Sequence, residues 1–129
     1  MTFTIGCDPE IFVTRNQKGV SAHGMIQGSK ESPFKTPRGA VQVDGMALEL
    51  NTDPVDISDF EGFNTNIVAQ MKYLRDAVNE GRPLDDRLNL SLKPVMDFDQ
   101  EVFDAAPDEA KELGCDPDFS AYTMEANPR

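Results

Sequence analysis

The chain has 129 residues, with 12 Lys and Arg against 23 Asp and Glu, so its formal charge is −11. This length suits one domain, which we place at residues 1–129. The acidic balance excludes the basic surface that binding to duplex nucleic acid or to anionic lipid requires. No apolar run approaches the roughly 18 residues that span a membrane, and two cysteines are too few for a disulfide scaffold.

The first half of the chain has the alternation of apolar and polar residues that is typical of β-strands. The expected strands, in chain order, are residues 3–7 continuing through 11–14, residues 20–26 and residues 40–51. A turn is expected at 16–19, and the Gly-, Ser- and Pro-rich residues 27–39 are expected to form a loop. Gly45 interrupts the last strand and predicts a bulge or a close approach of the backbone.

Residues 59–80 carry the strongest helix pattern in the chain. Apolar residues recur there at steps of three and four, from Phe60 to Val78. Ser58 or Asp59 is suited to cap the first turn, and Gly81 marks the end. This segment is therefore expected to be an amphipathic helix.

The last third predicts shorter elements. Residues 88–92 alternate like a half-buried strand, 99–106 and 107–114 have the composition of short helices, and 120–129 begin like a strand. Strands and helices do not alternate strictly along the chain. We therefore expect an α+β fold, with an antiparallel sheet and one main helix, about 59–80, packed on it.

Three short segments place a carboxylate two residues from a second side chain that carries oxygen. The pairs are Asp8 with Glu10, Glu49 with Asn51, and Glu125 with Asn127. Side chains at i and i+2 of a strand point to the same face, so neighbouring strands would gather up to four carboxylates there. Such crowding raises each pKa unless a cation neutralises the charges, and Mg²⁺ prefers oxygen ligands. The alternative is that these are ordinary polar residues on a solvated sheet face.

Charge is distributed unevenly along the chain. Residues 1–39 have a net charge of +2 and residues 97–129 a net charge of −8. The expected loop at 27–39 carries the cations Lys30, Lys35 and Arg38. Three cations on one loop can hold a phosphate or a carboxylate, and the alternative is a solvated surface loop.

Four blocks of the sequence, in order along the chain, resemble the carboxylate–amine ligases of phages, a family of amidoligases. The blocks are Gly6–Val13, Ile26–Pro33, Ala40–Asn51 and Gly114–Pro128. The resemblance covers nearly the whole chain and implies the fold of glutamine synthetase and glutamate–cysteine ligase. In that fold the concave face of an antiparallel sheet carries Glu side chains that hold Mg²⁺ and ATP. The implied reaction activates a carboxylate as an acyl phosphate, which an amine then attacks to give an amide.

The resemblance also implies roles for residues of this sequence. The implied metal ligands are Glu10, Glu49 and Glu125, with Asp8 beside the first of them. The implied neighbours that contact nucleotide or substrate are Asn51, Asn127 and Lys30. Lys35 and Arg38 are further candidates because they are cations of the expected loop, not because of the resemblance. The implied cofactors are Mg²⁺ and ATP.

Members of this family continue past the Glu-x-Asn-Pro segment into further strands with a His-rich motif. The one histidine here is His23. The resemblance therefore implies the N-terminal part of an amidoligase, completed by a second chain or by another copy of this chain.

Two other hypotheses stay open. The chain is a truncated, non-catalytic acidic phage protein that inhibits a basic host protein, such as a defence nuclease, by imitating nucleic-acid phosphate. Alternatively, it binds a metal or a small ligand without turnover. The start of the chain lacks the pattern of a secretory signal, so we expect the protein in the cytoplasm, which for a phage protein is that of the host.

Overall fold

The computed structural model describes residues 3–92, 96 and 98–111. The strands are β1 Thr4–Ile5, β2 Glu10–Arg15, β3 Lys18–Val20, β4 Phe34–Thr36, β5 Gly39–Asp44, β6 Ala47–Thr52, β7 Val55–Asp56 and β8 Asn89–Ser91. The helices are α1 Phe60–Asn79, the 3₁₀ turn η1 Leu84–Asp86, α2 Gln100–Ala105 and α3 Asp108–Lys111. The expected α+β class, with an antiparallel sheet and one main helix, is confirmed.

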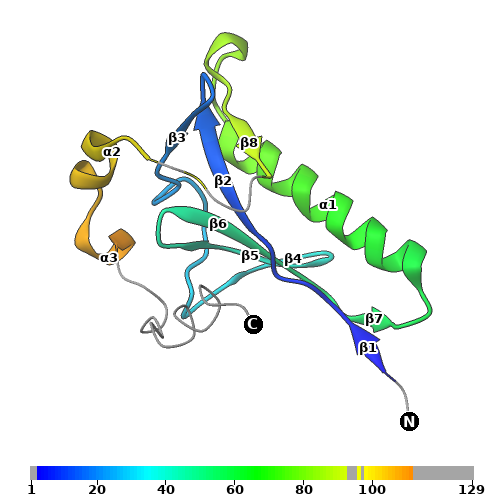
Figure 1. The fold of residues 1–129 in the computed structure, drawn as a ribbon. Coiled ribbons are helices and arrows are strands. Elements are labelled where there is room, and N and C mark those ends of the chain that lie inside the picture. The colour runs from blue at the N-terminus through cyan, green and yellow to red at the C-terminus, as the bar shows by residue number, and fades with distance from the viewer. Residues whose placement is uncertain (1–2, 93–95, 97, 112–129) are drawn as a thin grey trace, which may run out of the picture.

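The main sheet has the strand order β3-β2-β6-β5-β4, and β8 pairs with β2. Every pairing in it is antiparallel. β1 and β7 pair separately as a two-stranded ribbon beyond the end of the sheet (Figure 1). α1 runs diagonally along one side of the sheet, and α2 and α3 lie at the other end of the molecule from the ribbon. Within the described ranges, no helix has an apolar stretch of the length that a membrane crossing needs.

Gly45 lies in a turn, so its interpretation as a bulge was wrong, but the alternative of a close approach of the backbone is confirmed, because a Cβ atom there would lie 3.2 Å from the Ala110 carbonyl oxygen. β5 and β6 form a hairpin in which Asp44 pairs with Ala47. The two-residue loop between them gives Gly45 a φ of 61°, a value that short hairpin loops demand and that glycine adopts without strain. The hairpin brings the two halves of the expected strand side by side.

Three other predictions need correction. The strand expected at 3–7 and continuing through 11–14 is two strands, β1 and β2, which belong to different sheets. The strand that returns after the first turn ends at Val20 rather than at residue 26. Beyond it the Met25 N–H donates to the Ala22 carbonyl oxygen at 3.0 Å, which closes a local turn in place of a ladder. The expected loop at 27–39 contains β4, whose residues pair with β5.

The main helix has the bounds that the sequence predicts. The Asp59 side chain accepts a hydrogen bond of 2.9 Å from the Gly62 N–H and caps the first turn. Gly81 follows the last turn with a φ of 76°. The buried face is formed by Asn66, Gln70, Leu74 and Val78. Phe60, which we expected on that face, is 80% exposed.

The apolar core lies between α1 and the sheet. Leu74 and Val78 of the helix pack there against fully buried strand residues. The strand residues of this core are Ile11, Val13, Val41, Leu48 and Leu50. Because side chains alternate along a strand, the neighbours of these residues point to the face of the sheet away from α1.

Gln70 joins α1 to the sheet by hydrogen bonds within this core. Its side chain is 1% exposed. Its amide oxygen accepts from the Thr36 hydroxyl at 2.8 Å. Its amide nitrogen donates to the carbonyl oxygens of Asn51 at 3.0 Å and Ala40 at 3.3 Å. The polar residue is therefore fully satisfied in its buried position.

Gln70→Leu is expected to lower the free energy of unfolding by about 2–3 kcal/mol. Leucine has a similar volume, but it leaves the Thr36 hydroxyl and two carbonyl oxygens without this partner. Chemical denaturation measures the loss. Gln27→Leu, at an exposed loop residue, serves as the control and should change stability by less than about 0.5 kcal/mol. Equal stabilities of the two variants would contradict the prediction.

Candidate functional site

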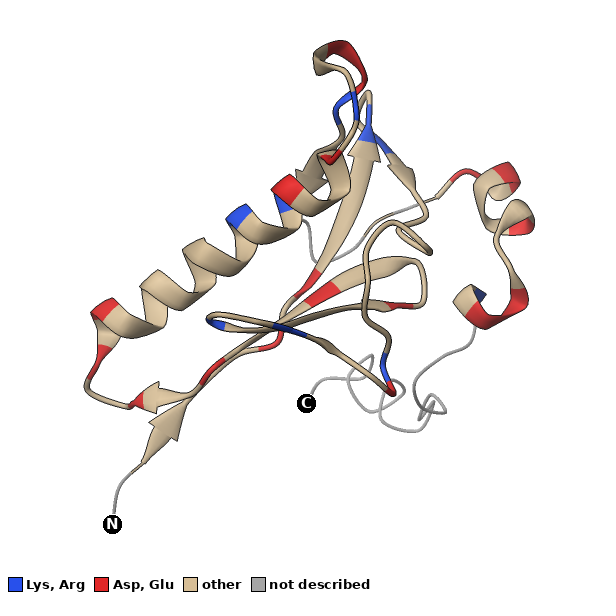
Figure 2. Cartoon of the chain, turned by 180° about the vertical axis from the view of Figure 1, so that it is seen from behind, with Lys and Arg blue, Asp and Glu red and all other residues tan. Residues whose placement is uncertain are grey.

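The face of the sheet away from α1 carries a row of polar side chains. Glu10 of β2 lies directly opposite Glu49 of β6, and Glu49 lies opposite Gln42 of β5. Figure 2 shows acidic positions meeting on neighbouring strands at the centre of the sheet. The strand register thus places carboxylates from two distant parts of the chain side by side.

Three carboxylates form a compact group at this point, which we call the acidic cluster: Glu10, Asp44 and Glu49. One carboxylate oxygen from each lies within 4.8 Å of the others. Glu10 is exposed, while Asp44 and Glu49 are half-buried. The three donors are hard oxygens on a partly open face, and this arrangement suits a divalent cation that keeps some of its water.

Glu10 and Glu49 were predicted from the sequence as metal ligands, but Asp44 was not. Asp44 lies two residues after Gln42 on β5, so the two share a face of the strand. The alternation of residues 40–44 was the available signal. This alternation identifies Asp44 as a neighbour of Glu49 only if Gly45 is known to turn the chain back.

The electrostatics of the cluster are those of crowded like charges. Partial burial, and then the charge of Asp44, raises the pKa of Glu10 above its ordinary value of 4.5. Partial burial also raises the pKa of Glu49, with the charges of Asp44, Asp8 and Glu10 adding to the effect. The ionised forms of both carboxylates are therefore less stable in the protein than in water, and a bound cation would reduce the repulsion between them.

An amide ladder fixes the orientation of Glu49. The Gln42 Nε2 donates to Glu49 Oε2 at 2.9 Å, and the Asn51 Nδ2 donates to Gln42 Oε1 at 3.4 Å. The expectation that Glu49 and Asn51 share one face is confirmed, since both contact the same Gln42 side chain. Asn51 therefore supports Glu49 indirectly, through its hydrogen bond to Gln42.

Asp8 is not part of the strand that carries Glu10. β2 begins at Glu10, so Asp8 precedes the strand instead of lying within it as expected. Pro9 has no N–H to contribute to a ladder, although its carbonyl oxygen accepts from the Leu50 N–H at 3.2 Å. Asp8 acts on the cluster through its charge, which raises the pKa of both Glu10 and Glu49.

The three cations of residues 27–39 have different partners in the fold. Lys30 lies near the cluster, where its charge favours the ionised form of Glu10 and so lowers its pKa. Lys35 forms an ion pair of 3.3 Å with Asp53. Arg38 donates to the Asn66 side chain of α1 at 3.3 Å, on the helix side of the sheet. The three cations therefore act on three different groups, Glu10, Asp53 and Asn66.

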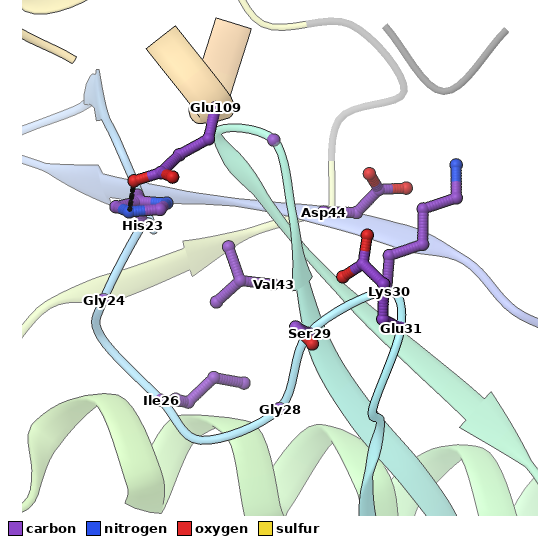
Figure 3. Close-up of a pocket in the computed structure, with 11 residues that line it drawn as sticks. His23, Gly24, Ile26, Gly28, Ser29, Lys30, Glu31, Val43, Asp44 and Glu109 are labelled. Atoms are coloured by element: carbon purple, nitrogen blue, oxygen red, sulfur yellow. Dashed lines mark ion pairs between the residues drawn. The ribbon is translucent and has the colours of Figure 1, made fainter. Parts of the chain in front are cut away.

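A cavity of about 640 Å³ opens beside the cluster, and Asp44 belongs to both. The loop that carries Lys30 forms one wall, and the start of the β5–β6 turn forms another. Figure 3 shows Glu109 of α3 reaching His23 across one end of the cavity, at 3.6 Å between Oε1 and Nε2. Sequence reasoning did not single out this cavity, because its walls come from three separate segments.

The remaining predicted residues, Glu125 and Asn127, lie outside the described residues. No family model, curated protein or solved structure matches the chain. The resemblance to the amidoligases rests on the four sequence blocks.

Proposed function

We propose that the chain is an amidoligase-like protein that joins a carboxylate to an amine with ATP and Mg²⁺, completed by a second chain or a further copy. The observation that carries the proposal is the direct cross-strand pairing of Glu10 with Glu49. These two residues come from separate blocks of the resemblance, 6–13 and 40–51, and the fold brings them together. Asp44, from the second of these blocks, joins them.

The proposed reaction has two steps. A carboxylate oxygen of the substrate attacks the γ-phosphorus of ATP, and the bond to ADP breaks. The amine nitrogen then attacks the acyl carbon, phosphate leaves, and the amine gives up a proton. Mg²⁺, when bound, neutralises the phosphate charges that otherwise resist both steps.

The residues of this chain would hold the cation and orient its ligands. Glu10, Asp44 and Glu49 offer three carboxylates to the cation, and the amide of Gln42 keeps Glu49 in place. Lys30, close enough to affect Glu10, is suited to contact a phosphate oxygen or a substrate carboxylate. The opposite face of the sheet is occupied by the core beneath α1, so nucleotide would bind on the open face.

Titration calorimetry with ATP tests the proposal. With Mg²⁺ present we expect binding, and Glu49→Gln should weaken it at least tenfold, because the cation loses a charged ligand. Without Mg²⁺ the heats should vanish. Glu101→Gln, which makes the same charge change at an exposed residue of α2, should bind like the original protein.

Flat heats with the unmodified chain would contradict the proposal. They would favour the acidic inhibitor, for which the net charge of −11 is the supporting observation. That protein would bind a basic partner with an affinity that falls steeply with salt. Binding of Mg²⁺ alone, without any effect of ATP, would instead favour a metal-binding domain without turnover.

A further inference from the structure

The cavity beside the acidic cluster has an uneven chemical lining. Val43 and Ile26 give it an apolar middle. Charged side chains stand at its two ends: His23 with Glu109 at one, and Lys30, Glu31 and Asp44 at the other (Figure 3). Its volume, about 640 Å³, is within the range of cavities that bind small molecules.

The charges at the two ends differ in whether they already have partners. Glu109 is engaged with His23. Lys30 makes no hydrogen bond or ion pair with another described residue, and its charge lowers the pKa of Glu10. Glu31 makes no hydrogen bond or ion pair with another described residue. Asp44 hydrogen-bonds with Glu10 and Glu49. At the end of the cavity nearest the cluster, Glu31 is therefore the carboxylate without such a partner among the described residues, and the three acidic groups of the cluster make this end negative.

We propose that this cavity binds a primary amine with a short aliphatic body. Its ammonium group would lie between Glu31 and Asp44, and its carbon chain would contact Val43 and Ile26. The identification as a substrate rests on the proposed function, since ligation needs an amine next to the activated carboxylate. Asp44 belongs to both the cavity and the cluster, which places the amine beside the proposed site of phosphoryl transfer.

The test is an NMR titration of the full chain with n-butylammonium chloride at pH 7, without Mg²⁺ or nucleotide. An alkylamine is protonated at this pH. We expect saturable shifts of the backbone amide signals of Gly28, Val43 and Gly45, which line the cavity. Butanol and butyrate, of similar length but neutral and negative, should bind at least fivefold more weakly.

Glu31→Gln is the informative variant, because Glu31 is exposed and lies outside the acidic cluster. It should weaken binding of butylammonium at least threefold, while Glu101→Gln should leave it unchanged. Equal binding of butylammonium and butanol would overturn the proposal, because the cavity would then recognise only the carbon chain and not the ammonium group. Preference for butyrate would overturn it in favour of a carboxylate held by Lys30.

The outcome is separable from that of the ATP titration. Loss of amine binding with ATP binding intact would reject the amine cavity and leave the ligase proposal standing. Amine binding that depends on Glu31, without any binding of ATP, would support the cavity as an amine site and reject the ligase reaction.

Discussion

Gly39→Ala is expected to lower the free energy of unfolding by about 3 kcal/mol, which corresponds to a fall in Tm of roughly 10 °C. Gly39 begins β5 where the strand, β6 and α1 meet. A Cβ atom there would collide with the Asn51 carbonyl oxygen and would lie 2.6 Å from Gln70 Nε2. The carbonyl belongs to the backbone of a paired strand, so it cannot move aside without disturbing the sheet.

Gly81→Ala is the matched control for this variant. Gly81 also has a positive φ, 76°, but a Cβ atom there would meet nothing within 4 Å. Gly81→Ala should lower the free energy of unfolding only by the strain of the backbone conformation, about 1 kcal/mol. Urea denaturation of both variants separates the two effects. A Gly39→Ala variant no less stable than Gly81→Ala would contradict the close approach seen at the start of β5.

The contacts between α1 and the start of β5 show which parts of the fold could be predicted from the sequence. The helix bounds depend on Asp59 and Gly81, whose roles at helix ends are local, so they could be predicted. The burial of Gln70 could not, because its partners on Thr36, Ala40 and Asn51 are far away in sequence. Periodicity favours apolar residues on the packed face. A buried amide fits there only when the sheet offers the complementary groups.

The acidic cluster shows the same limit. The common face of Glu49 and Asn51 follows from the period of a strand, and the contacts of Gln42 with both confirm it. Asp44 enters the cluster only because Gly45 turns the chain, and a glycine within an alternating run predicts a bulge as readily as a turn. Pairing of β2 with β6 joins residues about forty positions apart, and such register is not a local property.

Glu49→Gln is expected to stabilise the protein at pH 7 in the absence of divalent cations. The folded state holds the pKa of Glu49 above its ordinary value of 4.5, chiefly through burial and the charge of Asp44. Between the unfolded and the folded pKa, the folded protein binds more protons than the unfolded protein. Its free energy of unfolding therefore falls as the pH rises through this window and stays lower above it.

The glutamine keeps an oxygen that can accept from Gln42 but removes the charge that Glu10 and Asp44 oppose. We expect a Tm about 1–4 °C above that of the original protein at pH 7, since solvent screens these partly exposed groups. The difference should shrink towards zero below pH 4, where Glu49 itself is protonated in both folded and unfolded chains. Glu101→Gln controls for the general reduction of negative charge.

Mg²⁺ should reverse the order of thermal stability, so that the original protein has a higher Tm than Glu49→Gln. If the cluster holds the cation, millimolar Mg²⁺ stabilises the original protein by mass action, by about 2–5 °C in Tm, and has no such effect on Glu49→Gln. Thermal melts at pH 7 with and without Mg²⁺ measure both effects. A variant less stable than the original without the metal would show that Glu49 is held by favourable contacts that outweigh the repulsion. An equal response of both proteins to Mg²⁺ would place the cation elsewhere. The repulsion that weakens the metal-free fold and the affinity for the cation would have one origin, so a single substitution is expected to remove both.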